Sequence, residues 1–521
     1  MARSLARFRQ KIANINTKNK DGRPGLSQTE SVTKQPTLPD FPRTIFATAK
    51  RREQARIRAA RQHAVAASCG GYAQLFGDVL PPAFLEKIDP TPRKRHFGHV
   101  PVLWAWMGQV LEANASCSKG LGLVQAWCRD AGLPEPGGDT GGYCQARMRL
   151  SEEFLDSVHH EVCRKLNRTS PSGDRWKGMR LKAIDGSSVT LADTSENQAL
   201  YPQHSSSKPG CGFPIMGIVG VVDLGHGGWE GFATCIWKEH DARVAPRALK
   251  YISKGDLLLA DRGFCSYELL YRTTVQREAH ALFRLHQSRE RVLDWRKGKR
   301  ISRNERLVTW KKPISQSSGS TLDKKDWDAL PNEMQVRYIK CPYKDRGGKS
   351  GSLVVVTNLL NPSTHPGDEL IELYRLRWDI EVRLRDIKTT LKMERFAVGT
   401  PKMAHKTLKV MMLAYNLIRV AMQRAAAEAG LLARQMSFKG ALDVVNCGQG
   451  SLSRLAGKPR LIEAARQAVI ASCAARSLNI RPGRHEPRAI KTRPKNHQLL
   501  TRPRHEFKEV QHRETCYRKT S

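Results

Sequence analysis

The chain has 521 residues, of which 40% are hydrophobic, and no run of 18 or more uninterrupted apolar residues. This favours a soluble protein of two to four domains and excludes a membrane-spanning helix. Its 88 Lys and Arg residues outnumber 49 Asp and Glu, giving a net charge of +39. Residues 1–62 contribute +11, residues 481–521 contribute +8 and the middle contributes +20. We therefore expect a polyanionic partner, nucleic acid first, with ribosomal association and anionic membranes as alternatives.

The cysteines and the N-terminus indicate the compartment. The 12 cysteines are scattered without a CxxC pair, which argues against a zinc ribbon and for reduced thiols in a cytoplasm. The basic N-terminus lacks an apolar segment and a small-residue cleavage site, so no secretory signal is expected.

The first third of the chain is predicted to be an arm followed by helices. Residues 1–62 are basic and contain several prolines, which predicts a mobile arm with a short helix at 47–60. Residues 63–175 are predicted to be an all-helical N-terminal domain, because apolar residues recur at helical spacing. Its helices are expected at 100–113, 121–133 and 151–166, the last with Ser151 as N-cap. Trp104, Trp106 and Trp127 are expected in the core rather than stacked on bases.

From Met179 the pattern changes to strands. Residues 179–193 read as a strand, a turn at Gly186 and a second strand, with Asp185 at the end of the first. A hairpin is expected at 216–238, a short helix at 241–252 and a strand at 256–264 that delivers Asp261 at its C-terminal end. A helix at 265–279 and a strand at 280–286 follow. The predicted fold class is a mixed α/β sheet with helices.

Residues 286–356 are predicted to be a β-rich insertion in that sheet domain. Its short basic strands are expected at 291–300, 306–314, 334–343 and 350–359. Trp295 and Trp310 could stack on an unpaired base, but core packing is the preferred interpretation. After the insertion come a long apolar helix ended by Gly430, a helical region at 431–480 and a basic tail at 481–521.

One predicted helix, Glu369 to Met393, has an apolar stripe next to a stripe of charged and aromatic residues. At about 100° per residue its apolar side chains form one stripe. They are Leu373, Leu376, Ile380, Leu384, Ile387 and Leu391. The adjoining stripe contains Tyr374, Arg377, Glu381 and Lys388, with Arg385, Lys392 and Trp378 close behind. The alternative is an ordinary amphipathic helix whose i,i+4 ion pairs contribute about 0.3–0.5 kcal/mol each.

Three carboxylates are candidate ligands for Mg²⁺, a hard cation that prefers oxygen. Asp185 and Asp261 lie at the ends of apolar strands, where an unpaired charge is costly, and Glu381 joins them if the helix crosses the sheet. Two Mg²⁺ ions about 3.5–4 Å apart are the usual means of breaking a phosphodiester. As alternatives, Asp185 is a turn residue and Asp261 a helix N-cap. Asp193 and Asp223 are also strand-end acids that spacing does not exclude.

Three motifs resemble those of the bacterial insertion-sequence DDE transposases, in the group named for a Tyr-Arg-Glu-Lys signature (insertion sequence family four). They are IDGSS (184–188), LLLADRGFCSYELL (257–270) and YRLRWDIEVRLRDIK (374–388). Residues 140–150, 209–214, 412–419 and 437–442 are also similar to that group, so the resemblance runs from about 98 to 445. No signature residue is substituted.

The resemblance implies a ribonuclease-H-like catalytic domain at 176–285 and 357–430, interrupted by the insertion at 286–356. Asp185, Asp261 and Glu381 would be the catalytic residues that bind two Mg²⁺ ions, with Mn²⁺ as a substitute. Tyr374, Arg377 and Lys388 would hold the phosphates and distorted bases of the transposon end. Arg385 and Lys392 are added as DNA contacts from helix geometry alone.

The expected function is therefore a DNA transposase that cuts the ends of its own element and inserts the freed 3′ hydroxyl into target DNA. Residues 63–175 are expected to bind the terminal inverted repeats, and a homodimer is expected to pair two ends in the bacterial cytoplasm, at the nucleoid. Two alternatives remain: a recombinase that uses Tyr374 covalently, and a catalytically idle DNA-binding protein derived from a transposase.

Overall fold

The computed structural model describes residues 51–52, 54, 70–90, 96–113, 115–130, 134–316, 319–344, 350–455, 458–478, 503 and 506. The chain divides into two compact units, Met1–Ala60 and Arg61–Ser521, and every element named below belongs to the second. Nearly all of the predicted arm and of the tail at 481–521 lies outside the described residues; within the helix predicted at 47–60, only residues 51, 52 and 54 are described, and they are helical. None of the helices in the described ranges is long and apolar enough to cross a lipid bilayer.

Between residues 70 and 169 the regular elements of the described chain are all helices, as its periodicity predicts. The helices are α3 (Gly70–Leu75), α4 (Pro82–Ile88), α5 (His99–Leu111), α6 (Cys117–Asp130), α7 (Gly141–Arg149) and α8 (Glu152–Thr169). The Ser151 hydroxyl accepts a hydrogen bond from the Phe154 backbone N–H at 3.0 Å, which confirms it as the N-cap of α8. Trp104, Trp106 and Trp127 are buried, so their assignment to the core is confirmed.

The strands of the described chain join in one mixed sheet. They are β1 (Arg175–Trp176), β2 (Met179–Leu191), β3 (Ile215–Asp223), β4 (Trp229–Ile236), β5 (Leu257–Ala260), β6 (His280–Arg284), β7 (Lys299–Ser302), β8 (Glu305–Lys311), β9 (Glu333–Lys344), β10 (Ser350–Thr357) and β11 (Arg395–Phe396). The order is β4-β3-β2-β5-β6-β10-β9-β8-β7, with β1 and β11 both paired to β2.

The direction of the strands changes across this sheet. Strands β2, β3 and β4 form an antiparallel meander, whereas β2, β5 and β6 run parallel. Strands β10, β9, β8 and β7 continue from β6 as antiparallel neighbours. The predicted β-rich stretch therefore extends the same sheet. The strand predicted at 291–300 is largely wrong: residue 291 ends helix α12 (Gln287–Arg291), residues 292–298 form turns and loop, and β7 begins only at Lys299.

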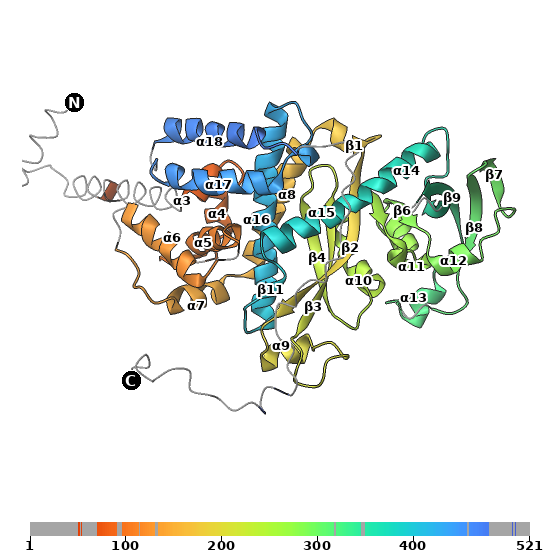
Figure 1. Ribbon diagram of the computed structural model, residues 1–521, viewed down its shortest axis with the longest axis horizontal. Coiled ribbons are helices and arrows are strands. Elements are labelled where there is room, and N and C mark those ends of the chain that lie inside the picture. Colours follow the sequence, from red (N-terminus) through yellow and green to blue (C-terminus); the bar gives the residue numbers. More distant parts are fainter. Residues whose placement is uncertain are drawn as a thin grey trace, which may run out of the picture. The chain divides into compact units, whose positions relative to one another are not determined.

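The helices that follow α8 in the chain pack on the sheet or on other helices. They are α9 (Ser195–Leu200), α10 (Asp241–Ala248), α11 (Tyr267–Tyr271), α12 (Gln287–Arg291), α13 (Lys324–Asp328), α14 (Gly367–Arg375), α15 (Asp379–Arg385), α16 (Pro401–Glu428), α17 (Phe438–Ser453) and α18 (Pro459–Ala474). Alternate residues of β2 contribute to two separate cores: Ala183 belongs to the one that contains α15 and α16, and Ile184 to the one that contains α10 and α11. Helices α14 and α15 run diagonally across the sheet (Figure 1).

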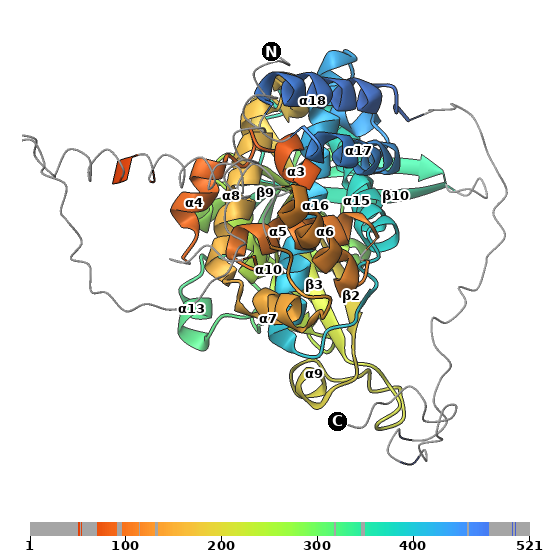
Figure 2. The same cartoon turned by 90° about the vertical axis from the view of Figure 1, so that its left-hand side faces the viewer.

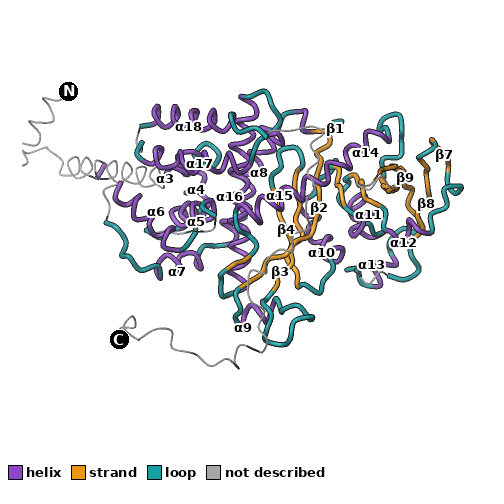
Figure 3. Tube along the Cα trace, viewed as in Figure 1, coloured by secondary structure: helices purple, strands orange, loops and turns teal. Residues whose placement is uncertain are grey.

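Segments from the two ends of this unit share one core. Helix α3 packs on α17, where the Tyr72 hydroxyl donates to Asn446 Oδ1 at 3.0 Å. The Arg466 guanidinium of α18 donates to the Gln74 carbonyl at 2.7 Å. Figure 2 shows α3, α17 and α18 side by side, and Figure 3 shows these helices with α4 to α7 on one side of this unit, and the strands with shorter helices between them on the other. The long helix α16 is followed by Gly430 in the left-handed region (φ +64°), as predicted.

Candidate active site

The sheet brings the two aspartates of the candidate triad to the same place. Ile184 of β2 pairs with Ala260 of the parallel strand β5, so Asp185 and Asp261 follow paired residues on neighbouring strands. Asp261 is the first residue after β5, and its carboxylate accepts a hydrogen bond from the Gly263 N–H at 2.7 Å. It therefore caps only the short turn Arg262–Phe264, while Ser266 caps α11. The apolar strand β5 thus places Asp261 directly after its C-terminal end.

The predicted turn at Gly186 is wrong. Strand β2 runs unbroken through Asp185 and Gly186, because both residues pair with β3, in the register Asp185–Gly220 and Gly186–Val219. A Cβ at Gly186 would overlap the carboxylate of Asp241, the first residue of α10. The glycine is therefore explained by this close approach rather than by a turn. Burial raises the pKa of Asp241, and the nearby charge of Asp261 adds to that effect.

We expect Gly186→Ala to destabilise the protein by about 1–3 kcal/mol, because the added methyl group must displace Asp241. The measurement is the urea midpoint of unfolding. Combining it with Asp241→Ala should recover most of the loss. A double variant as unstable as Gly186→Ala would show that the glycine is needed for another reason.

The signature segment is helical but irregular, unlike the single regular helix predicted for Glu369 to Met393. Helix α14 passes through a 3₁₀ turn at Leu376–Trp378 into α15, and then through a π turn at Asp386–Thr390. The predicted apolar stripe nevertheless faces the core. Leu373, Ile380, Ile387 and Leu391 are buried, and Leu376 and Leu384 are partly buried against them.

Arg377 joins two members of the candidate triad. Its Nη1 lies 3.9 Å from Asp185 Oδ2 and its Nη2 lies 3.5 Å from Glu381 Oε1. The Glu381 side chain is 58% exposed, so it borders the site from solvent, whereas Asp185 is 21% exposed. Helix α15 and the 3₁₀ turn before it therefore bring the Glu381 carboxylate and the Arg377 guanidinium to the strand that carries Asp185.

The charges in this site affect one another. Burial raises the pKa of Asp185 to about 6; the Gly186 N–H and Arg377 oppose this shift, while the charges of Asp261 and Glu381 reinforce it. Asp261 and Glu381 therefore each lie within electrostatic reach of Asp185. The three acids are not a closed cluster: among the described residues, the group whose ligand atoms all lie within 4.8 Å is a different one, around His226.

The other residues predicted to contact DNA lie at different depths. Tyr374 is buried, and burial raises its pKa to about 12. Lys388 is half-buried in the π turn, and Arg385 and Lys392 are exposed. Lys392 has a left-handed backbone (φ +60°) just after the helical segment. The tertiary structure thus keeps Tyr374 with Arg377 and places the outer cations further along the same segment.

A cavity of about 310 Å³ opens beside Tyr374, between α14 and strands β6, β9 and β10. Its lining includes Arg284, Cys341, Tyr374 and Trp378. Tyr374 and Trp378 meet edge to face at 6.4 Å, and Trp378 is 45% exposed. Arg284 is the last residue of β6, and its Nε is buried without a hydrogen-bond partner among the described residues. The cavity therefore combines aromatic walls with a buried cation.

Sequence reasoning missed two residues of this region, Asp241 and Arg284. Arg284 had a usable signal, because it ends an apolar strand parallel to β5. It directly follows Phe283, which pairs with Ala260, just as Asp261 directly follows Ala260. Asp241 had none beyond its place at the start of a helix.

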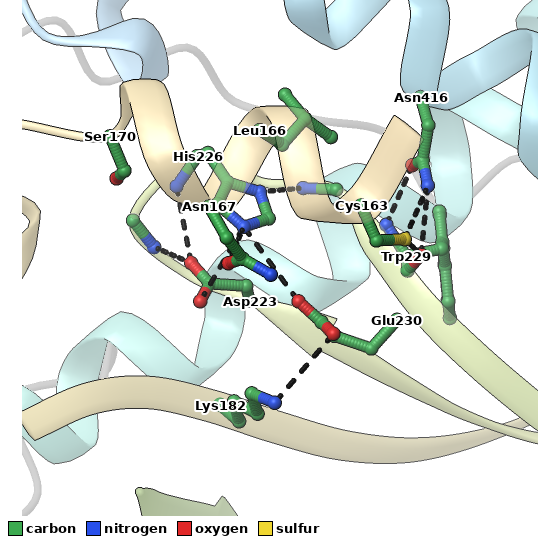
Figure 4. A network of polar contacts seen from close by, with 12 residues as sticks. Cys163, Leu166, Asn167, Ser170, Lys182, Asp223, His226, Trp229, Glu230 and Asn416 are labelled. Carbon is green, nitrogen blue, oxygen red and sulfur yellow. Dashed lines mark hydrogen bonds and ion pairs between the residues drawn. The ribbon is translucent and has the colours of Figure 1, made fainter. Parts of the chain in front are cut away.

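A second group of potential metal ligands consists of Asp223, His226 and Glu230 (Figure 4). Asp223 is the last residue of β3 and Glu230 lies in β4. The His226 Nδ1 accepts a hydrogen bond from the Gly228 N–H at 3.0 Å, so Nε2 carries the proton of the neutral ring. Nε2 points at Asn167 Oδ1, 3.0 Å away, and burial lowers the pKa of His226 to about 4. A protonated Nε2 cannot ligate a metal, which makes this group a hydrogen-bonded network.

Lys182 supplies the positive charge of that network. Its ammonium lies 3.0 Å from Asp256, 3.7 Å from Glu230 and 2.8 Å from the Tyr251 carbonyl oxygen. Asp256 precedes β5, whereas Asp261 follows it, so the network and the candidate triad occupy opposite ends of this strand.

Comparison with known proteins gives the class. Residues 176–417 match the family described as the transposase DDE domain, a stretch that contains Asp185, Asp261 and Glu381. Over these residues the chain is therefore similar to the DDE transposases. It is also similar to the transposase InsG of insertion sequence element IS4 from Escherichia coli (strain K12), with 26% identity over 379 residues, covering 70% of this chain and 80% of InsG.

Two further proteins are similar to the chain. The putative transposase InsZ of Escherichia coli (strain K12) is 23% identical over 212 residues, which cover 38% of this chain and 66% of InsZ. Among solved structures, a cryo-EM structure of the piggyBac transposase synaptic complex with hairpin DNA matches with a TM-score of 0.39 and 9% identity, covering 77% of this chain and 84% of that one.

Proposed function

We propose that the protein cuts DNA at the ends of its own mobile element and joins the freed 3′ hydroxyl to target DNA, with Asp185, Asp261 and Glu381 as the catalytic carboxylates. The observation that carries this proposal is the convergence of the three acids from β2, the end of β5 and α15, with one guanidinium between two of them. We also propose that the protein acts in the bacterial cytoplasm, at the nucleoid.

The donor set fits Mg²⁺, with Mn²⁺ as a substitute. The three acids offer only oxygen ligands, and they stand where burial disfavours an uncompensated charge on Asp185. Divalent ions bound there would activate a water and stabilise charge on the attacking and leaving oxygens of a phosphodiester. Two ions are proposed by analogy with that chemistry.

The chain's own residues would position the DNA. The guanidinium of Arg377 has the geometry to donate two parallel hydrogen bonds to a phosphate. Lys388, Arg385 and Lys392 extend the positive charge along the same segment. The cavity beside Tyr374 suits a base splayed from the transposon end, because aromatic walls stack on any base and Arg284 adds a cation.

The strand order β4-β3-β2-β5-β6 has three antiparallel strands followed by two parallel ones. We assign this part, with α14 and α15, to the ribonuclease-H-like catalytic unit, and residues 286–356 to its insertion. We propose that the helices between 63 and 175 recognise the terminal inverted repeats. We also propose that a homodimer pairs two transposon ends.

Burial of Tyr374 disfavours the covalent recombinase. Its side chain is 3% exposed, and its raised pKa keeps the hydroxyl protonated, so it is neither accessible nor activated as a nucleophile. The idle DNA-binding protein is disfavoured because no acid of the triad is replaced.

The test is cleavage of a duplex that carries one end of the element, followed on a gel with Mg²⁺, with Mn²⁺ and with EDTA. We expect cutting with either ion and none with EDTA, and Tyr374→Phe should still cut. Cutting that persists in EDTA and is lost in Tyr374→Phe would replace this proposal with the covalent one.

A further inference from the structure

Arg377 occupies an unusual position for a residue expected to bind DNA. Its side chain is only 9% exposed, although it lies beside two acids at the mouth of the site. Its contacts with Asp185 and Glu381, at 3.9 and 3.5 Å, are longer than good charge-assisted hydrogen bonds. The guanidinium is therefore held by the charge of the two carboxylates, together with a hydrogen bond to Tyr374 and a contact with the Trp378 ring, whose centroid is 5.3 Å away.

The guanidinium also has unused donor capacity. Its Nε is buried and has no hydrogen-bond partner among the described residues. Leaving a buried donor unsatisfied is costly, and for a charged group the cost is larger. A phosphate oxygen would satisfy it, because the guanidinium fork matches phosphate geometry. The same side chain thus has two competing partners, the two carboxylates and the DNA backbone.

A divalent ion shared by Asp185 and Glu381 would need the space between them. A guanidinium there repels such an ion and neutralises the ligands that would bind it. Among the described residues Arg377 forms ion pairs with Asp185 and Glu381 but not with Asp261, which cannot by itself replace the shared position. Movement of Arg377 toward a phosphate would remove the repulsion and free both carboxylates.

We propose that Arg377 is a positioning residue that makes divalent-ion binding depend on DNA: it holds Asp185 and Glu381 as their counter-ion until a DNA phosphate draws it away. This rests on the proposed function, because it takes the three acids as the metal ligands. By linkage, DNA raises the affinity for the ion and the ion raises the affinity for DNA by the same factor. The protein without DNA is then a weak metal binder and a poor nuclease.

The test measures Mn²⁺ binding by calorimetry on the full-length protein, alone and with a duplex that carries one end of the element. In the absence of DNA, we expect Arg377→Gln to bind Mn²⁺ about tenfold more tightly than the wild type, because one repelling charge is gone. DNA should tighten Mn²⁺ binding to the wild type but leave that of Arg377→Gln unchanged. Arg377→Lys keeps the charge and should stay near the wild type without DNA.

Two controls separate the possible failures. Arg164→Gln removes a guanidinium paired with Glu161 on α8, away from the site, and should bind Mn²⁺ as the wild type does. Asp185→Asn should lose Mn²⁺ binding; if it does not, the carboxylate site is wrong and both proposals fall. If Asp185→Asn loses binding but Arg377→Gln binds no more tightly than the wild type, the counter-ion role alone is overturned. A purely structural role predicts that outcome, since loosening the site weakens metal binding with and without DNA.

Discussion

Replacing Glu381 by Gln is expected to reduce DNA cutting on the order of 10³-fold or more while leaving binding to the transposon end nearly unchanged. The amide keeps the size of the side chain but removes the charge that a divalent ion requires. The side chain is 58% exposed, so the fold loses little. The measurement is single-turnover cleavage of an end duplex, with binding followed by fluorescence anisotropy.

Glu372→Gln is the matched control for this experiment. Glu372 lies on α14, is 66% exposed and pairs with Arg375, so it is an exposed, ion-paired glutamate of the same helical segment that lies outside the site. It should cut at the wild-type rate. A Glu381→Gln variant that cuts like Glu372→Gln would remove Glu381 from the catalytic set.

Replacing Lys182 by Met is expected to lower the free energy of unfolding by about 3–5 kcal/mol, because it leaves buried carboxylates without their counter-ion. Lys182 is 1% exposed and lies between Asp256 and Glu230, with Asp223 adjacent in the network of Figure 4. The observable is the urea midpoint, and the double variant with Asp256→Asn should regain part of the loss.

Lys254→Met is the control for that substitution. Lys254 pairs with Glu278, but both side chains are well exposed, so removing this pair should not shift the midpoint measurably. EDTA should leave the wild-type midpoint unchanged, since the protonated Nε2 of His226 excludes a metal from this network. An EDTA-sensitive midpoint together with a tolerant Lys182→Met would reverse that interpretation.

The sequence predicted best what depends on local periodicity. The helix that begins after Ser151, the hairpin of β3 and β4, and the strand that ends before Asp261 all follow from spacing of apolar residues and from capping chemistry. Asp261 directly follows its apolar strand as predicted, whereas β2 continues through Asp185, so the approach of these two acids depends on the pairing of β2 with β5. Their actual register required the sheet.

The errors have a common cause, which is contact between distant segments. Gly186 resembles a turn residue in sequence, yet strand β2 continues through it by pairing with β3. The glycine is needed because Asp241, 55 positions later, occupies the space that a side chain would fill. The Glu369–Met393 segment departs from ideal helix geometry through its 3₁₀ and π turns, which idealised spacing cannot anticipate. The placement of Arg377 between two carboxylates likewise depends on how α15 crosses β2.

Packing of α3 against α17 has a consequence for synthesis of the protein. A ribosome releases Tyr72 long before Asn446, and the hydrogen bond between them completes a core to which both ends contribute. The early helices must therefore wait, with apolar faces uncovered, until almost the whole polypeptide has emerged. A message interrupted downstream of the Glu381 codon would encode every proposed catalytic residue and still yield a product unable to bury its first helices.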